Sequence, residues 1–180
     1  MDNYFIKSGY KNNSVKTFND DGIENYWNDT RLETSKQFQF DVYRLAKEMY
    51  VNEELKSVLD VGAGPGTKMN MFFNDSGDAH IIDQSSVQPI ANRICPNATF
   101  HDMNLDKTDF SLNRTFDMII CADVIEHLDN PDNLLDLIKR HMGENSILII
   151  STPERDTRRG VNNQQSPNDE HVREWNKDEF

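Results

Sequence analysis

Short continuous apolar runs recur along the chain and predict strands buried on both faces. Each run is four to seven residues long and ends at polar residues or glycine. We predict strands at Ser57–Val61, Ala79–Asp83, Phe116–Ala122 and Ser146–Ser151, with a weaker strand at Ala98–His101.

Between these runs the apolar residues follow a helical spacing. Helices are predicted over Thr67–Phe73 and Ser85–Ile94, and a third has Asp129 as its N-cap and Pro131 near its first position. The apolar residues of this third helix are Leu134, Leu135, Leu137 and Ile138. Strands that alternate with helices predict an α/β fold: a Rossmann-like, doubly wound, mostly parallel sheet with helices on both faces.

A further helix is predicted from Thr34, before the first strand. Its apolar positions fall on one helical face and are Phe38, Val42, Leu45 and Met49. Tyr26 and Trp27 precede it and are expected to help cover a site. Residues 1–20 are polar without periodicity, so we expect them to be poorly ordered, or ordered only by contact with another segment. Residues 21–180 then form a single domain.

Charge and composition exclude several classes of function. The chain has 31 acidic and 19 basic side chains, a formal net charge of −12, which disfavours nucleic acid and anionic membrane surfaces as partners. No apolar run approaches the length of a membrane span, and the N-terminus lacks the layout of a signal peptide, which favours a cytoplasmic protein. Two cysteines, Cys95 and Cys121, without a Cys/His cluster argue against disulfides and zinc, so no metal ligand is predicted.

A glycine cluster follows the first predicted strand and opens the next helix. Its sequence is Asp60-Val61-Gly62-Ala63-Gly64-Pro65-Gly66-Thr67. Glycines at this place allow positive φ angles and a close approach of the backbone to a ligand. The G-x-G-x-G spacing excludes a P-loop and differs from the dinucleotide G-x-G-x-x-G pattern. Taken alone, it fits a turn that binds no ligand equally well.

Acidic residues at the ends of the next two strands favour a nucleoside ligand. Asp83 ends the second strand, where a carboxylate can accept both hydroxyls of a ribose. Asp102 ends the third, where it can accept from an adenine amino group while Met103 covers the ring. Either aspartate alone fits a helix cap or a solvated turn. Together with the glycine cluster they stand in the order that one bound nucleoside requires.

These segments resemble the motifs of class I S-adenosylmethionine-dependent methyltransferases over about Asn25–Phe180. The four matching segments are Val58–Thr67, Ile81–Asp83, His101–Met103 and Phe116–Leu128, the last with a specific Asp-x-x-x-x-x-Asp-Val-x-Glu-His-Leu pattern. Four more stretches resemble a bacterial subset often encoded beside glycosyltransferases, which hints at a glycan-related acceptor: Tyr26-Trp27, Gln39–Ala46, Ser151–Arg159 and Ser166–Phe180.

The resemblance implies S-adenosyl-L-methionine as cofactor and S-adenosyl-L-homocysteine as product. It places Asp83 on the ribose, Asp102 with the Met103 backbone on adenine, and Cys121 and Ala122 beside the reactive methyl group. The complete cofactor-binding set that it implies is Asp60, Gly62, Ala63, Gly64, Gly66, Asp83, Gln84, Asp102, Met103, Cys121 and Ala122. Arg31 or Lys36 is the candidate partner of the methionine carboxylate.

Methyl transfer from a sulfonium is an SN2 displacement that requires in-line positioning and a dry cavity. A general base is needed only if the nucleophile must lose a proton. His127 and His171 are the candidate bases, although each also fits a structural role. The polar stretch 152–174 is expected to fold over the carboxyl edge of the sheet, with Arg158 or Arg173 holding an anionic acceptor. Trp175 either closes the pocket or anchors the core.

Two other functions remain open at this stage. An NAD-dependent oxidoreductase would use the same fold, although the glycine spacing and the Asp123–Leu128 segment speak against it. A non-catalytic module that binds the cofactor and scaffolds a partner is also compatible. The sequence leaves the acceptor open among protein, lipid, sugar and small metabolites, and we favour a small-molecule or glycan acceptor without nucleic acid.

The chain is short for this family. A full class I sheet has seven strands, and here Trp175–Phe180 resembles the start of the helix that follows strand five. We therefore expect a sheet without the C-terminal β-hairpin. An exposed edge of the fifth strand is a pairing liability, so we predict a homodimer or a partner that covers it.

Overall fold

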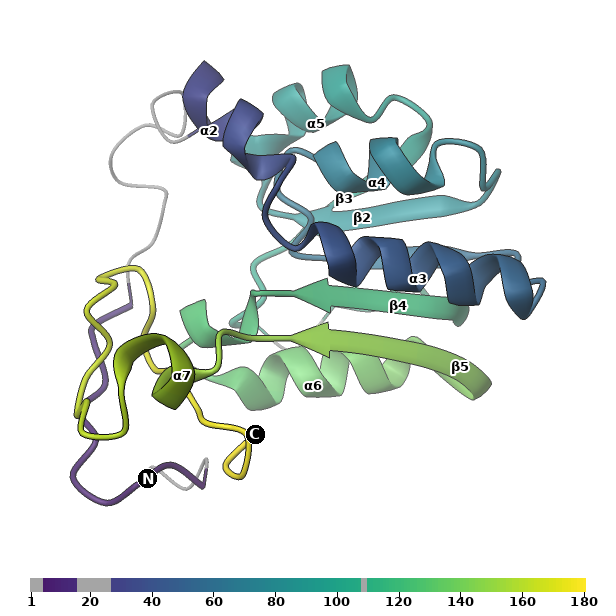
Figure 1. Ribbon diagram of the computed structural model, residues 1–180. Coiled ribbons are helices and arrows are strands. Elements are labelled where there is room, and N and C mark those ends of the chain that lie inside the picture. The colour runs from purple at the N-terminus through teal and green to yellow at the C-terminus, as the bar shows by residue number, and fades with distance from the viewer. Residues whose placement is uncertain (1–4, 16–26, 108–109) are drawn as a thin grey trace.

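The computed structural model describes residues 5–15, 27–107 and 110–180, which form a five-stranded parallel sheet (Figure 1). The strand order is β3-β2-β1-β4-β5, and every neighbouring pair is parallel. The strands are β1 Val58–Val61, β2 Ala79–Asp83, β3 Ala98–Asp102, β4 Phe116–Ala122 and β5 Met142–Ser151. The predicted Rossmann-like α/β fold is confirmed, and among the described residues β5 forms an edge of the sheet.

Two helices precede β1, three lie in connections between strands and one follows β5, among the described residues. They are α2 Asp29–Ser35, α3 Phe40–Asn52, α4 Thr67–Phe73, α5 Gln88–Ile94, α6 Pro131–Arg140 and α7 Arg155–Arg159, with short 3₁₀ turns η1 Ser85–Val87 and η2 Ile125–His127. No helix among the residues described is long and apolar enough to cross a membrane.

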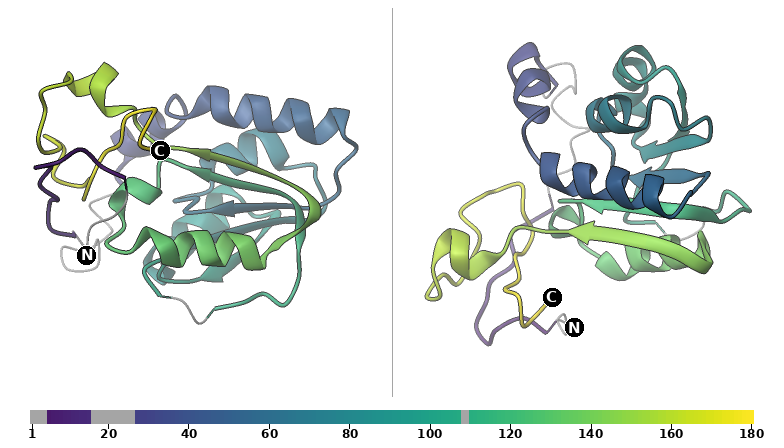
Figure 2. Two further views of the ribbon diagram at one scale, coloured as in Figure 1. Left: turned by 90° about the horizontal axis from the view of Figure 1, so that it is seen from below. Right: turned by 45° about the vertical axis from the view of Figure 1, so that its right-hand side comes forward.

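Helices lie on both faces of the sheet (Figure 2). The sheet separates two hydrophobic cores. On one face, Tyr43 of α3 and Phe73 of α4 pack with Ile120 of β4. On the other face, Leu134 and Leu137 of α6 pack against the strand side chains that point to that face. Burial on both faces explains why the strands read as continuous apolar runs instead of alternating ones.

The helix predicted from Thr34 is two helices, and its buried face differs from the predicted one. Gln39 has a positive φ of 55° and separates α2 from α3, so Phe38 lies outside α3. Phe38 and Leu45 are exposed, and the buried residues of α3 are Tyr43, Ala46 and Tyr50. The Tyr43 hydroxyl donates to Asp60 Oδ2 at 2.8 Å, which fixes the rotation of the helix.

Three further boundaries differ from the prediction. Asn130, not Asp129, is the N-cap of α6, because the helix begins one residue later, at Pro131. Leu135 is exposed on that helix. The fifth strand begins at Met142, and residues 175–180 form a turn rather than a helix.

The N-terminal segment 5–15 lies along the C-terminal segment. The Asn13 amide donates to the Val172 carbonyl at 2.8 Å, and the Lys11 amide donates to the Gln164 carbonyl at 2.8 Å. Asn13 Nδ2 reaches three more carbonyls of the same segment, those of Ser166, Asn168 and His171. The described part of this polar segment is therefore held by contact with residues near the other end of the chain. Tyr26 lies outside the described residues.

Candidate functional site

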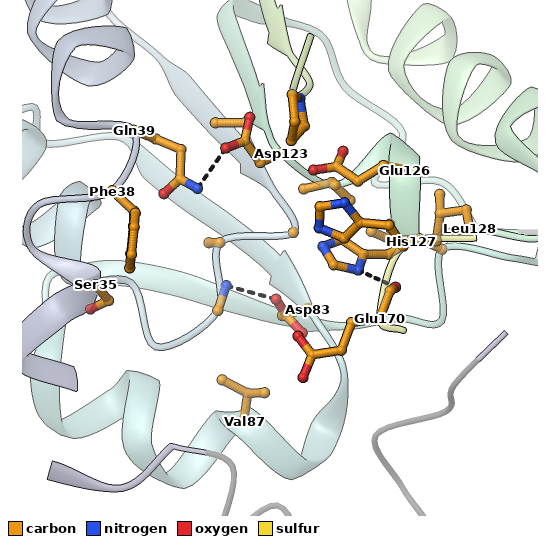
Figure 3. A pocket seen from close by; sticks show the side chains of 18 of the residues that line it. Ser35, Phe38, Gln39, Asp83, Val87, Asp123, Glu126, His127, Leu128 and Glu170 are labelled. Carbon is orange, nitrogen blue, oxygen red and sulfur yellow. Dashed lines mark hydrogen bonds between the residues drawn. The ribbon is translucent and has the colours of Figure 1, made fainter. Parts of the chain in front are cut away.

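A cavity of about 610 Å³ lies at the carboxyl ends of the strands (Figure 3). The chain leaves β1 toward β2 on one side, whereas β4 and β5 extend the sheet on the other side of β1. This reversal is a topological switch point, the place where open α/β sheets bind ligands. The cavity walls include the glycine turn after β1, the end of β2 and the η2 turn after β4.

The glycine turn lines the cavity through Gly62, Ala63 and Gly64. Gly62 and Gly64 have φ angles of 77° and 56°, which side-chain-bearing residues rarely adopt. A Cβ on Gly62 would lie 2.5 Å from Val124 Cγ2, and one on Gly64 would lie 2.8 Å from Trp27 Cζ2. Both positions therefore exclude a side chain by conformation and by space, and Trp27 covers the turn.

Gly66 has a different task. It is the N-cap of α4 at a φ of 72°, and a Cβ there would lie 2.9 Å from Cys95 Cβ. It does not line the cavity. Its absent side chain lets α4 pack closely against α5 and β2.

Asp83 lines the cavity at the end of β2 and is held by two backbone amides. Its Oδ2 accepts from Gly64 N at 2.7 Å and its Oδ1 accepts from Gln84 N at 2.7 Å. Burial raises the pKa of Asp83, and the two amides oppose that shift. Gln84 also lines the cavity. The carboxylate is thereby fixed next to the glycine turn, with oxygen lone pairs remaining for a ligand.

Asp60 lies in β1 just before the glycine turn and does not line the cavity. The side chain is buried, and its Oδ2 accepts from the Tyr43 hydroxyl. Its Oδ1 is buried without a hydrogen-bond partner among the described residues. Burial raises the pKa of Asp60 to about 7, although the Tyr43 hydrogen bond and the Lys68 charge lower it.

The remaining predicted cofactor residues divide between cavity wall and core. Met103 and Ala122 line the cavity, whereas Asp102 is exposed and Cys121 is fully buried, both away from it. Cys121 belongs to the core on the α6 side of the sheet. Sequence reasoning missed the three residues that continue the wall after Met103, which are Asn104, Leu105 and Asp106.

Sequence reasoning also missed a polar bridge across the cavity mouth. Lys68 Nζ donates to Gln39 Oε1 at 3.2 Å, and Gln39 Nε2 donates to Asp123 Oδ2 at 2.8 Å. Burial lowers the pKa of Lys68. Asp123 lies in the motif after β4 and Gln39 opens the Gln39–Ala46 stretch that resembles the bacterial subset, so both had a signal, whereas nothing in the spacing indicates Lys68.

Both candidate bases line the cavity, and the structure brings them together. The rings of His127 and His171 meet edge to face with centroids 4.8 Å apart. Burial and the neighbouring His171 lower the pKa of His127. Glu126 stands beside them, and burial together with the Asp123 carboxylate raises its pKa to about 8.

The basic residues divide into cavity-lining and structural groups. Arg31, Arg158 and Arg159 line the cavity, and Arg31 pairs with Glu170 at 3.4 Å. Lys36 lies outside it and pairs with Glu33.

Arg173 and Trp175 have structural positions. Arg173 is buried and donates to the carbonyls of Leu128 and Asp129. Trp175 is 3% exposed in the core on the α6 side and does not line the cavity.

The chain combines an α/β fold with a glycine turn and a carboxylate at the end of β2, and both line a cavity at the topological switch point. Together these features define the class of protein. Residues 30–180 match the family model described as a methyltransferase domain, and the chain belongs to that family. The class I S-adenosylmethionine-dependent methyltransferase indicated by the sequence motifs is thereby confirmed as its family and fold.

Two curated relatives are similar to part of the chain. A protein named ubiquinone biosynthesis O-methyltransferase from Glaesserella parasuis serovar 5 (strain SH0165) is 25% identical over 120 residues, 59% of this chain and 51% of the relative. A protein of the same name from Rickettsia canadensis (strain McKiel) is 28% identical over 101 residues, 54% of this chain and 43% of the relative. The chain spans about half the length of these relatives.

Two solved structures share the fold. CalS10, an amino pentose methyltransferase from Micromonospora echinaspora involved in calicheamicin biosynthesis, solved with S-adenosylmethionine bound, matches with a TM-score of 0.60 at 15% identity over 71% of this chain and 57% of that one. DesVI of Streptomyces venezuelae matches with a TM-score of 0.57 at 19% identity over 77% and 59%.

Proposed function

We infer that this protein transfers a methyl group from S-adenosyl-L-methionine to a small-molecule or glycan-type acceptor. The observation that carries this inference is the cavity wall at the switch point, where the Gly62–Gly64 turn lies within hydrogen-bond distance of the Asp83 carboxylate. A nucleoside with a charged amino-acid tail requires both features, a close backbone approach and a buried carboxylate for the ribose.

The residues present fit this cofactor. A side chain is excluded at Gly62 and Gly64, so the backbone can approach the methionine portion closely. Met103 and Leu105 supply an apolar wall for the adenine ring. Arg31 lines the cavity and is a better candidate than Lys36 for the methionine carboxylate.

S-adenosylmethionine supplies an electrophilic methyl group on a sulfonium whose departure as a neutral thioether needs no protonation. The chain therefore has to hold the ribose through Asp83, exclude water with Trp27, and position the acceptor in line with the methyl group. His127 and His171 face the cavity on the acceptor side. If the nucleophile must lose a proton, His171 is our candidate to accept or orient it.

The small-molecule acceptor is supported by the cavity and by the comparisons. Its size lies in the range of ligand pockets that hold a cofactor and a small partner. The names of the curated relatives describe methylation of an oxygen in ubiquinone biosynthesis, and CalS10 is described as acting on an amino pentose. Arg158 lines the same cavity and could pair with an anionic group of such an acceptor.

Calorimetric titration with S-adenosylmethionine tests the cofactor site. Asp83→Ala should weaken binding by about tenfold to a hundredfold, because charge-assisted hydrogen bonds to the ribose contribute about 1.5–3 kcal/mol. Asp136→Ala removes an exposed acid on α6 and is the matched control. Equal affinity of Asp83→Ala and wild type would contradict the assignment.

Turnover separates an enzyme from a cofactor-binding scaffold. Release of S-adenosylhomocysteine is measured with quinol, phenol and amino-sugar acceptors. We expect release that depends on one acceptor class and falls in Asp83→Ala. Binding without release across all of these acceptors would favour the non-catalytic module.

A further inference from the structure

Glu126, His127 and His171 form a cluster of metal-ligating side chains at the cavity wall. Each offers one donor atom, and the three atoms lie within 4.8 Å of one another. Glu126 and His127 come from the η2 turn after β4, whereas His171 comes from the C-terminal segment, 44 residues further along the chain. All three line the cavity, and Figure 3 shows Glu126 and His127 side by side at its wall.

Hydrogen bonds hold both histidine rings in the manner of metal ligands. The Nδ1 atom of His127 lies 2.7 Å from the Glu170 carbonyl, and that of His171 lies 2.6 Å from Glu174 Oε1. Both partners can only accept, so each Nδ1 carries the proton and a neutral ring has its lone pair on Nε2. A carbonyl or carboxylate behind the ring is the usual support of a metal-bound histidine.

The support behind His171 is itself fixed. Glu174 is fully buried, accepts from Arg159 at 3.0 and 3.1 Å, and accepts from Ser166 Oγ at 2.9 Å. These contacts hold the carboxylate in place behind the His171 ring. The ring of His171 is therefore oriented before any ligand arrives.

Glu126 supplies the carboxylate of the cluster. The side chain is fully buried, and its Oε2 accepts from Thr152 Oγ1 at 3.1 Å. Its Oε1 has no hydrogen-bond partner among the residues that the structure describes. A buried carboxylate oxygen without a partner is costly, and a cation held by the two histidines would supply one.

We propose that Glu126, His127 and His171 bind one divalent cation of the Zn²⁺ class, with open coordination positions toward the cavity. Two imidazoles and one carboxylate are the protein ligands of several open zinc sites, and the same set binds Fe²⁺. Donors on one zinc stand about 3–4 Å apart, so the side chains close slightly around the ion. The sequence predicted no metal ligand because it has no cysteine cluster. A site of two histidines and one carboxylate needs no cysteine, so that argument does not apply to it.

A role in the reaction rests on the proposed function. The open positions would take oxygen atoms of the acceptor, hold them in the cavity and lower the pKa of a hydroxyl bound there. His127 and His171 would then act through the metal instead of accepting the proton themselves.

Metal uptake tests the site without cofactor or acceptor. The protein is stripped with a chelator and dialysed against limiting Zn²⁺, and bound metal is measured by mass spectrometry. A parallel titration with Co²⁺ follows the visible absorption of the bound ion. We expect the wild type to bind one equivalent of metal. In Glu126→Gln and in His171→Gln the affinity for the metal should fall by about a hundredfold or more, because even residues that only support a ligand contribute about tenfold to a hundredfold. His80→Gln, a partly buried histidine elsewhere in the sheet, should retain the wild-type uptake.

Melting temperatures and S-adenosylmethionine binding of the same variants show that each is folded. The proposal would be overturned if the wild type took up no stoichiometric metal. It would also be overturned if both site variants took up as much metal as the wild type. Loss of uptake in His80→Gln alone would place the ion elsewhere and also overturn it. Metal uptake without cofactor binding would instead contradict the proposed function and leave the metal site standing.

Discussion

Asp60 is one of the buried carboxyls that make the stability of this protein depend on pH. Its pKa rises to about 7 in the folded chain because burial disfavours the charged form, with Asp83 adding a smaller effect. Tyr43 from α3 and Lys68 from α4 face it and partly oppose the shift. The folded state therefore binds this proton more tightly than the unfolded chain. Stability from Asp60 is fully present below about pH 4 and is lost as the pH rises through 7.

The variant Asp60→Asn isolates this contribution. It keeps an acceptor for the Tyr43 hydroxyl but cannot ionise. Its free energy of unfolding relative to that of the wild type should therefore rise between pH 5 and pH 8. The rise should be a few kcal/mol, because one pKa unit corresponds to about 1.4 kcal/mol. Urea unfolding at pH 5, 6.5 and 8 measures the difference. The free energy of unfolding of Asp136→Asn should change with pH as that of the wild type does. The same behaviour in Asp60→Asn would contradict the raised pKa of Asp60.

At the residue scale, the sequence predicts the positions that backbone geometry dictates. Gly62 and Gly64 line the cavity because the turn after β1 demands positive φ, and Asp83 lines it because it ends β2. Cys121 and Asp102 were harder to place. One-residue steps along a strand change the face of the sheet, and Cys121 points into the core, one position before the cavity-lining Ala122.

At the element scale, the C-terminal segment depends on one buried arginine. Arg155 is 1% exposed and donates to Glu179 at 3.0 Å, to Asp156 at 2.9 Å and to the Glu174 carbonyl at 3.1 Å. Glu179 also accepts from the Lys7 amide at 2.9 Å, so the N-terminal segment shares the same anchor. This segment carries His171, which links the anchor to the cavity.

Removing that anchor should loosen the segment. Arg155→Ala is expected to lower the free energy of unfolding by about 3–5 kcal/mol, because it leaves Glu179 without its buried partner. Arg114→Ala breaks an exposed pair with Asp78 and should cost less than about 1 kcal/mol.

Hydrogen exchange separates local loosening from global loss. Faster exchange of the Val172 amide, which donates to the Glu126 carbonyl at 2.8 Å, is expected in Arg155→Ala at conditions where the sheet stays protected. Unchanged exchange in this segment, or equal losses of stability in the two arginine variants, would contradict the anchoring role.

The strands and the helices between them follow from the sequence, whereas the ends of the chain do not. Apolar runs that are buried on both faces and bounded by polar residues favour strands, and β2 and β4 have the predicted bounds. The break at Gln39 comes from a positive φ that no local pattern encodes. Residues 152–180 are polar and include arginines and carboxylates that pair with one another. Such pairs have no fixed spacing in the sequence, so the segment shows no periodicity from which its structure could be predicted.

At the scale of the whole molecule, the β5 edge stays open among the described residues. β5 pairs with β4 alone there, and Ile147 and Ile149 are only partly buried. Because an open edge pairs readily with another strand, we expect a second copy of the chain to cover it. Light scattering after gel filtration should give twice the chain mass. A monomer whose β5 amides exchange freely on the outer edge would contradict this expectation.

The identity of the cofactor distinguishes a methyltransferase from an NAD-dependent enzyme, and one calorimetric comparison decides between them. The wild-type protein is titrated with S-adenosylmethionine and, separately, with NADH under the same conditions. A cavity built from the Gly62–Gly64 turn and Asp83 should bind S-adenosylmethionine at one site per chain and show no saturable heat with NADH. Saturable binding of NADH together with no binding of S-adenosylmethionine would contradict the account.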